Sequence, residues 1–135
     1  MAHYILDTNH LSPIVTIDHP LRDKLVQCIR QKEEFTIPTP VLTEFLYGIQ
    51  VLPRAKQNME EWEKFSETFY YREVDRDDAE QAALLQVSLR RRGWQLNTVD
   101  ALIAAIALRY DLILLTADKD LSAISELKQE NCLTT

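Results

Sequence analysis

The sequence of 135 residues has few of the residues on which glycine-rich and cysteine-based sites depend. Its only glycines, Gly48 and Gly93, lie far apart, so no glycine-rich loop is present that could cradle a phosphate. The two cysteines, Cys28 and Cys132, fit no metal-ligand spacing, and we expect both to be reduced, buried thiols. These scarcities exclude a phosphate loop of that kind and a cysteine-based metal site.

Long hydrophobic runs are also missing. The longest uninterrupted apolar stretch, ALIAAIAL at residues 101–108, is far shorter than the ~18 residues that a membrane span requires. The N-terminus lacks the basic start, the long apolar stretch and the small-residue cleavage site of a signal peptide. The sequence therefore predicts a cytoplasmic protein that has no membrane contact.

Positive charge is in the minority, because 21 acidic residues face 15 basic ones and the net charge is −6. An acidic protein does not coat nucleic acid by bulk attraction, which disfavours a basic DNA-coating protein. A nuclease stays compatible with this charge, since metal ions offset the carboxylates that bind them. Apolar residues make up 46% of the chain, and no repeat or linker divides it, so we expect one domain over residues 1–135.

Short apolar strands alternate with helical patterns along the chain. Strands are expected at residues 4–6, 35–40, 72–74 and 112–116, and helices near residue 8 and at residues 20–33, 40–49, 54–71, 77–92, 97–110 and 121–127. Such alternation predicts an α/β fold in which a central parallel sheet is flanked by α-helices. An apolar stripe on the helix at 54–71 should pack on the domain; it comprises Met59, Trp62, Phe65 and Phe69.

Acidic residues occupy conspicuous positions in this pattern. Asp7 directly follows the strand at 4–6, and Asp118 comes two residues after the strand at 112–116. Both belong on the ligand-binding edge, because ligands of an open α/β sheet lie outside the carboxyl ends of its strands. Glu44 is polar within an apolar helical run. Asp100 lies in the first turn of the helix at 97–110, where the helix dipole alone would stabilise it by ~0.3–1 kcal/mol.

Four carboxylates at one site would repel one another unless they were protonated or bound a cation. No lysine or arginine is adjacent in sequence to Asp7, Glu44 or Asp100. Oxygen ligands of this kind favour Mg²⁺ or Mn²⁺, whereas zinc favours histidine and cysteine ligands. The three histidines have no ligand spacing, and we expect them to be surface or capping residues: His3, His10 and His19.

The segments YILDTN, TEFLYG, VDALIAAIAL and LLTADKD resemble the motifs of the PIN domain in their order and approximate spacing. The resemblance runs from Tyr4 to about Leu121 and is closest to the small VapC-like toxins of prokaryotic toxin–antitoxin pairs. It implies a PIN-like fold and a metal-dependent endoribonuclease that cleaves RNA phosphodiester bonds with Mg²⁺ or Mn²⁺. It also implies a cognate antitoxin as partner and a homodimer.

The resemblance carries the family's catalytic and metal-binding acids over to three positions here: Asp7, Glu44 and Asp100. The fourth acid falls in TADKD, where Asp118 is favoured and Asp120 is the alternative. Asn9 and Thr116 match polar positions that support the acids through hydrogen bonds.

LRRRGW at residues 89–94 is the only tight basic cluster. Its cations Arg90, Arg91 and Arg92 could steer RNA phosphate toward the acids, but cations at a helix C-terminus are also stabilised by the dipole alone. Trp94 and Tyr47 could stack on bases, although packing in the core or on the surface is the interpretation that we favour.

Other functions also place acids at the strand ends of an α/β sheet. A phospho-receiver module would carry an adjacent pair of acids after its first strand, whereas here Thr8 follows Asp7. A haloacid-dehalogenase-type phosphatase would need an aspartate where Asn9 stands. The remaining alternative is a PIN fold that binds RNA or a protein partner without cleaving RNA, and the presence of all the family acids disfavours it.

Overall fold

The computed structural model describes residues 2–31 and 34–131. Its strands are β1 (His3–Leu6), β2 (Glu34–Pro38), β3 (Tyr70–Arg72), β4 (Ile113–Leu115) and β5 (Gln129–Glu130). They form one parallel sheet in the order β3-β2-β1-β4-β5, with β1 at its centre. The predicted α/β fold with a central parallel sheet is therefore confirmed.

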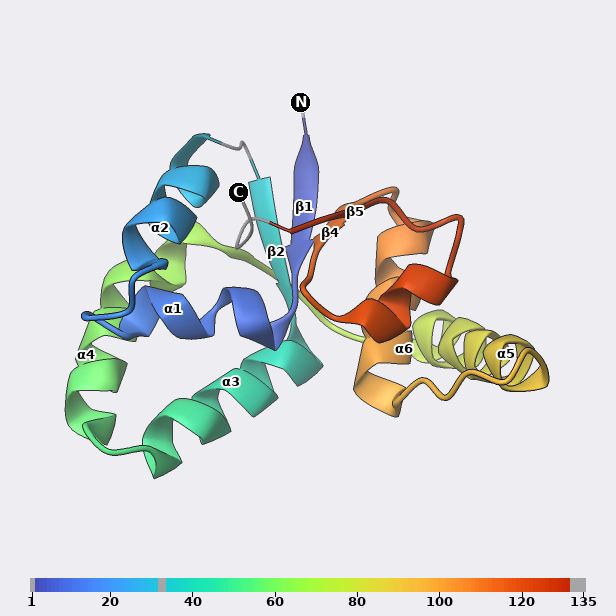
Figure 1. Cartoon of the computed structure of the whole chain (residues 1–135), viewed down its shortest axis with the longest axis horizontal. Coiled ribbons are helices and arrows are strands. Elements are labelled where there is room, and N and C mark those ends of the chain that lie inside the picture. Colours follow the sequence, from blue (N-terminus) through green and yellow to red (C-terminus); the bar gives the residue numbers. More distant parts are fainter. Residues whose placement is uncertain (1, 32–33, 132–135) are drawn as a thin grey trace.

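Helices connect these strands and cover both faces of the sheet. The α-helices are α1 (Ser12–Val15), α2 (Arg22–Gln31), α3 (Thr39–Val51), α4 (Ala55–Phe65), α5 (Arg76–Arg91) and α6 (Thr98–Arg109), and the 3₁₀ helices are η1 (Thr8–His10), η2 (Ser66–Thr68) and η3 (Lys119–Ala123). Figure 1 shows α1 to α4 on one side of the sheet and α5 and α6 on the other. The sheet is thus the middle of three layers.

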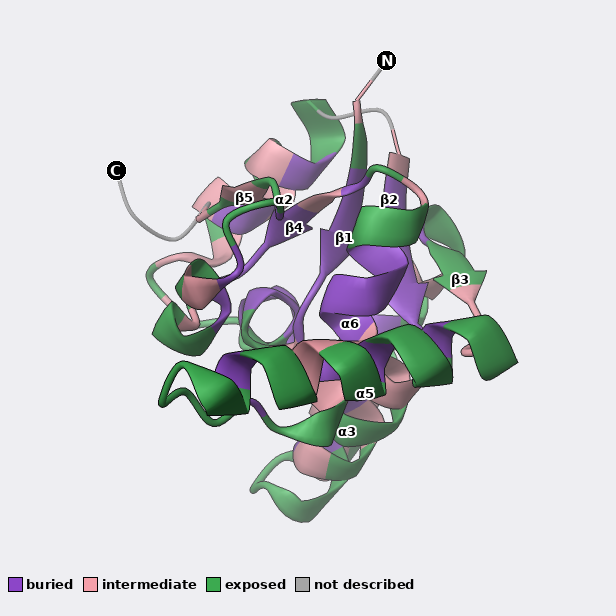
Figure 2. Ribbon diagram, turned by 90° about the vertical axis from the view of Figure 1, so that its right-hand side faces the viewer, coloured by how far each residue is buried: buried purple, intermediate pink, exposed green. Residues whose placement is uncertain are grey.

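The central strands are apolar because helices cover them on both faces. Ile5 and Leu6 of β1 and Leu114 and Leu115 of β4 are fully buried. Helix α6 packs beside β4, and its run from residue 103 to 107 is buried throughout. Figure 2 shows α6 enclosed behind α5, whose outer face is exposed. Because the chain enters α6 at the carboxyl edge of the sheet, residues in its first turn lie near the ends of the strands.

Several boundaries differ from the sequence-based predictions. The helix expected over 54–71 ends at residue 65, and β3 spans 70–72 instead of 72–74. The helix expected near 121–127 is only the 3₁₀ helix η3, and the following strand β5 was not predicted. Leu114 and Leu115 pair with β5, so the backbone there finds hydrogen-bond partners on the sheet edge. A helix of one or two turns is marginal by itself, and residues 124–128 form turns and irregular structure between η3 and β5.

The predicted apolar stripe packs on the domain. Trp62 and Phe69 are buried, and Met59 and Phe65 are partly buried against the same core. The Trp62 ring meets Phe45 edge-on, with centroids 4.9 Å apart, and stacks on Phe69 at 5.7 Å. These contacts attach α4 firmly to the rest of the molecule.

The structure bears on the expectations for the cysteines and for a membrane span. The expectation of a reduced thiol is wrong for Cys28, which is half-buried on α2 and disulfide-bonded. Spacing along a chain cannot predict such a bond, because it says nothing about distances after folding. Cys132 lies outside the described residues. Within the described ranges, no helix is both long enough and apolar enough to cross a membrane.

Candidate active site at the carboxyl ends of the strands

Asp7 directly follows β1 and is buried, with 5% of its surface exposed. Its carboxylate is held on both sides: Oδ2 accepts a hydrogen bond from the Thr116 hydroxyl, and Oδ1 accepts one from the backbone N–H of His10 at 3.2 Å. Asp7 is also the N-cap of η1. These donors explain how a carboxylate is tolerated at the edge of the core.

His10 was wrongly expected at the surface or as a cap. Its side chain is completely buried, and its Nδ1 lies 3.3 Å from Oδ1 of Asp7. The other histidines fit the expectation: His3 is exposed and contacts Glu34, and His19 accepts a backbone hydrogen bond two residues along the chain. The signal for His10 was its spacing, since a 3₁₀ turn returns to the same side after three residues.

Thr116 connects Asp7 to Asp118. Its hydroxyl donates to Asp7 and accepts the backbone N–H of Asp118 at 3.0 Å. The register explains the contact: Leu6 of β1 pairs with Leu115 of β4, so the residues that follow both strands lie side by side. The polar position that the resemblance singled out is therefore in contact with two of the acids.

Asp100, in the first turn of α6, lies close to Asp7 and Asp118. Asn97 caps this helix: it accepts the backbone N–H of Asp100 and donates from its amide to Asp100 Oδ2, both at 2.8 Å. Burial, a side-chain hydrogen bond with Asp118 and the charge of Asp118 raise the pKa of Asp100 from 3.8 to about 7, and the charge of Asp7 adds to the rise. Three aspartates from separate segments therefore face one another closely enough to repel.

Asp118, and not Asp120, is the acid of the TADKD segment that meets the others. Asp118 is partly buried and lies against Asp100 and Thr116. Asp120 is exposed, and its backbone N–H donates to Oδ1 of Asp118 at 2.9 Å. The backbone of Asp120 thereby orients the Asp118 carboxylate.

Glu44 and Asn9 lie at the rim. Glu44 is exposed on α3, and its Oε1 accepts a hydrogen bond from the hydroxyl of Thr8, the residue after Asp7, at 3.3 Å. Asn9 is exposed in η1. Among residues 2–31 and 34–131, its side chain makes no hydrogen bond to an acid, so the support that the resemblance implied for Asn9 is not seen.

The side chains that could bind a metal ion at this site offer carboxylate oxygens as ligands. In the part of the chain that the structure describes, no three histidine, cysteine or acidic side chains already form a complete set of metal ligands. The chemistry of Asp7, Asp100 and Asp118 nevertheless fits a hard cation such as Mg²⁺ or Mn²⁺. Such a cation would relieve the repulsion that raises the pKa of Asp100.

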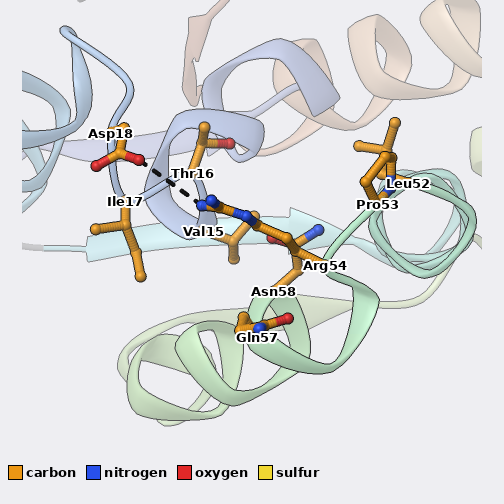
Figure 3. Close-up of a pocket in the computed structure, with 9 residues that line it drawn as sticks. All are labelled: Val15, Thr16, Ile17, Asp18, Leu52, Pro53, Arg54, Gln57 and Asn58. Carbon is orange, nitrogen blue, oxygen red and sulfur yellow. Dashed lines mark ion pairs between the residues drawn. The ribbon is translucent and has the colours of Figure 1, made fainter.

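A groove leads from Glu44 between α1 and α3. It consists of two adjoining cavities of about 90 and 340 Å³, which share four residues: Val15, Thr16, Leu52 and Asn58. Figure 3 shows Arg54 reaching across the larger cavity to Asp18, an ion pair of 3.7 Å. Ile17 and Leu52 keep 53% and 56% of their surfaces exposed, so an apolar surface adjoins the candidate site.

The basic cluster lies at the end of α5, where residues 90–92 are exposed. The Arg92 guanidinium donates to the carbonyl of Ala123 at 3.3 Å. Trp94 and Tyr47 are 42% and 69% exposed, so both aromatic side chains lie at the surface.

The profile of the PIN domain family matches residues 4–127, nearly the whole chain. The chain belongs to the PIN domain family. No curated protein matches this PIN domain in sequence.

Similar folds occur in solved bacterial structures. VapBC2 from Rickettsia felis, bound to a DNA fragment from its promoter, matches with a TM-score of 0.81 and 22% identity over 96% of this chain and 98% of that chain. FitAcB from Neisseria gonorrhoeae matches with a TM-score of 0.81 and 18% identity, over 98% of this chain and 99% of that chain. VapC20 from Mycobacterium tuberculosis, a sarcin-ricin loop cleaving toxin, matches with a TM-score of 0.70 and 16% identity, over 89% of this chain and 93% of that chain. At these identities the likeness shows the fold of the PIN domain.

Proposed function

We propose that this PIN domain is a Mg²⁺- or Mn²⁺-dependent endoribonuclease that hydrolyses RNA phosphodiester bonds. The observation that carries the proposal is the meeting of Asp7, Asp100 and Asp118 at the carboxyl ends of β1 and β4. Carboxylates gathered from three segments against their mutual repulsion are typical of a site that binds a cation. Membership of the PIN domain family supports the same function.

Each side chain has a role in this proposal. Asp7, Asp100 and Asp118 would hold the metal ion, with Glu44 at the rim. The ion, when bound, polarises the phosphate and lowers the pKa of the attacking water. Thr116 holds one oxygen of Asp7, the Asn97 amide holds one oxygen of Asp100, and the backbone N–H of Asp120 holds one oxygen of Asp118. These hydrogen bonds keep the acids in one orientation.

We also propose that the protein is the toxin of a toxin–antitoxin pair, and that a cognate antitoxin covers the groove between α1 and α3. The exposed Ile17 and Leu52 offer an apolar surface for such a partner, and the groove begins at Glu44. The similarity of the fold to VapBC2 supports this partner. A homodimer, implied by the family resemblance, belongs to the same proposal and is tested by light scattering of the purified chain.

The test combines thermal unfolding with cleavage of a mixed RNA pool. Mn²⁺ at ~100 times its dissociation constant should raise the free energy of unfolding by ~2.7 kcal/mol if only the folded state binds it. Asp7→Asn should lose both this stabilisation and the cleavage, while circular dichroism shows that it remains folded. EDTA should abolish cleavage by the unaltered protein.

Asp77→Asn is the matched control, because Asp77 lies near Arg109, at the opposite end of α6 from Asp100. It removes the same charge and should keep both properties. Stabilisation by Mn²⁺ without cleavage of any RNA in the pool would favour the non-catalytic binding module. If Mn²⁺ changed neither property, the proposal would be wrong.

A further inference from the structure

The loop between α5 and α6 contains a separate cavity, of about 560 Å³. Its walls include Val87, Arg90, Trp94, Gln95 and Leu96. Leu96 is only 5% exposed and gives the cavity an apolar floor, while Trp94 keeps 42% of its surface exposed. An aromatic ring, a guanidinium and a carboxamide around an apolar floor form the combination that proteins use to bind unpaired bases.

The end of α5 fixes the position of Trp94. The backbone N–H of Trp94 donates to the carbonyl of Leu89 at 2.9 Å, and the backbone N–H of Gly93 donates to the carbonyl of Arg90 at 3.0 Å. Gly93 has a φ of 84°, the left-handed conformation with which glycine often ends a helix. Because this turn is closed by hydrogen bonds, the Trp94 backbone has little freedom left to lose when a ligand binds.

Unpaired positive charge borders the cavity at Arg90 and continues along residues 91 and 92. Elsewhere in the chain Arg22, Arg54, Arg76 and Arg109 each form an ion pair with a carboxylate. Residues 90–92, by contrast, form no ion pair with any acid that the structure describes. In a protein of net charge −6, this concentration of cations is suited to phosphate groups.

One wall of the cavity continues into the segment that carries Asp100. The Gln86 amide donates to the carbonyl of Leu96 at 2.9 Å, which fastens the loop to α5. The next residue, Asn97, is the one that caps α6 and holds Asp100. The cavity and the candidate active site are therefore joined by a short, hydrogen-bonded stretch of chain.

The basic cluster is also tied to the segment that carries Asp118. Arg92 donates to Ala123, the last residue of η3, and Asp118 is the N-cap of that same 3₁₀ helix. The end of α5 is thus connected to two of the three facing aspartates. The cavity therefore lies beside the segments that position Asp100 and Asp118.

We infer that the cavity is a subsite for one unpaired nucleobase of the RNA substrate, with the base on the Trp94 ring and Arg90 on a neighbouring phosphate. The inference rests on the proposed function and adds a substrate preference to it. Bases in an A-form duplex are stacked inside and cannot enter such a cavity, whereas bases of single strands and loops can. The subsite therefore directs cleavage to unpaired RNA.

Intrinsic fluorescence provides the test, because Trp62 and Trp94 are the only tryptophans and Trp62 is 4% exposed. A short oligouridylate, added in EDTA so that it is not cut, should quench the fluorescence of Trp94. Because substitution of Trp94 removes this signal, the affinities of the variants are measured by fluorescence anisotropy of a dye-labelled oligouridylate. Affinity should fall by at least about fivefold in Trp94→Ala and stay close to that of the unaltered protein in Trp94→Phe. Arg90→Gln should lower the salt dependence of binding by ~0.7 in its logarithmic slope.

Two matched controls should bind like the unaltered protein. Tyr70→Ala removes an aromatic ring that is 58% exposed on the edge strand β3, and Arg76→Gln removes a cation from the other end of α5. Equal affinity in Trp94→Ala, or binding of duplex RNA as tight as that of single-stranded RNA, would overturn the subsite. These results are read without cleavage, so they are independent of the metal and cleavage tests of the proposed function.

Discussion

At the scale of the residue, the environment of Asp7 decides what the candidate site can do. The two oxygens of this buried carboxylate are held by different donors, Thr116 on one and the backbone N–H of His10 on the other. The His10 ring adds a second group beside the same oxygen, and it is buried completely. A carboxylate fixed in this way presents its remaining lone pairs in one direction.

We predict that His10→Leu lowers the affinity for Mn²⁺ by ~10-fold or more, because loss of a group that orients a metal ligand typically costs 10–100-fold. Leucine fills a similar volume but removes the ring nitrogen 3.3 Å from Asp7. The affinity is measured from the rise in unfolding temperature during a Mn²⁺ titration.

His10→Asn offers an amide N–H in place of the ring nitrogen and should recover part of the affinity. A purely structural role for His10 would lower the unfolding temperature of both variants without changing the Mn²⁺ concentration at half-effect. That outcome would contradict the positioning role.

At the scale of the element, α5 and α6 are joined by charges at one end. Asp75 and Asp78 form a capping box at the start of α5, with backbone N–H contacts of 2.9 and 3.1 Å. Arg109, at the end of α6, donates to Asp75 Oδ2 at 2.7 Å and to Asp78 Oδ1 at 3.1 Å. This arrangement ties the outer helix to the buried one, far from the aspartates of the candidate site.

Asp75→Asn should lower the unfolding temperature at neutral pH, since asparagine can still cap the helix but cannot pair with Arg109. The backbone N–H of Asp78 and the side chain of Arg109 hold the pKa of Asp75 below its ordinary value. A carboxyl with a lowered pKa in the folded state stabilises that state above its unfolded pKa, and the contribution disappears as the pH falls through the folded pKa. The difference between variant and unaltered protein should therefore vanish in acid.

The measurement is thermal unfolding of both proteins over a series of pH values. Asp77→Asn should show a smaller effect at every pH, because the contact of Asp77 with Arg109 is longer, at 3.8 Å. A difference for Asp75→Asn that stayed constant down to strongly acidic pH would contradict the ion-pair explanation.

At the scale of the whole molecule, the core and the candidate site are separate. The fully buried side chains of β1 and β4 are apolar, and Asp7 has its hydrogen-bond partners within the chain. Folding therefore does not depend on a metal, unlike that of small domains whose metal site replaces a core.

We predict that exhaustive treatment with EDTA leaves the far-ultraviolet circular dichroism and the cooperative unfolding transition in place. It should lower the unfolding temperature only by the contribution of the bound ion. Unfolding of the chain on removal of metal would contradict this separation of core and site.

The class of the fold and the chain positions of the acids could be predicted from the amino-acid sequence alone. Unbroken apolar runs predicted β1 and β4, since a strand covered on both faces needs no polar side. The position of Asp7 and Asp118 after these strands, and of Asp100 in the first turn of a helix, followed from the same pattern. These features depend on near neighbours in the chain, which a sequence displays directly.

Tertiary structure decided how these parts meet. It buried His10 on Asp7, selected Asp118 over Asp120 as the acid that faces Asp100, and added β5 to the edge of the sheet, where no strand had been expected. The hydrogen bond between Asp7 and Thr116 joins residues 109 positions apart, and it exists because β1 and β4 pair in one register. Such contacts depend on strand order and packing across the whole molecule, so no local pattern of residues contains them.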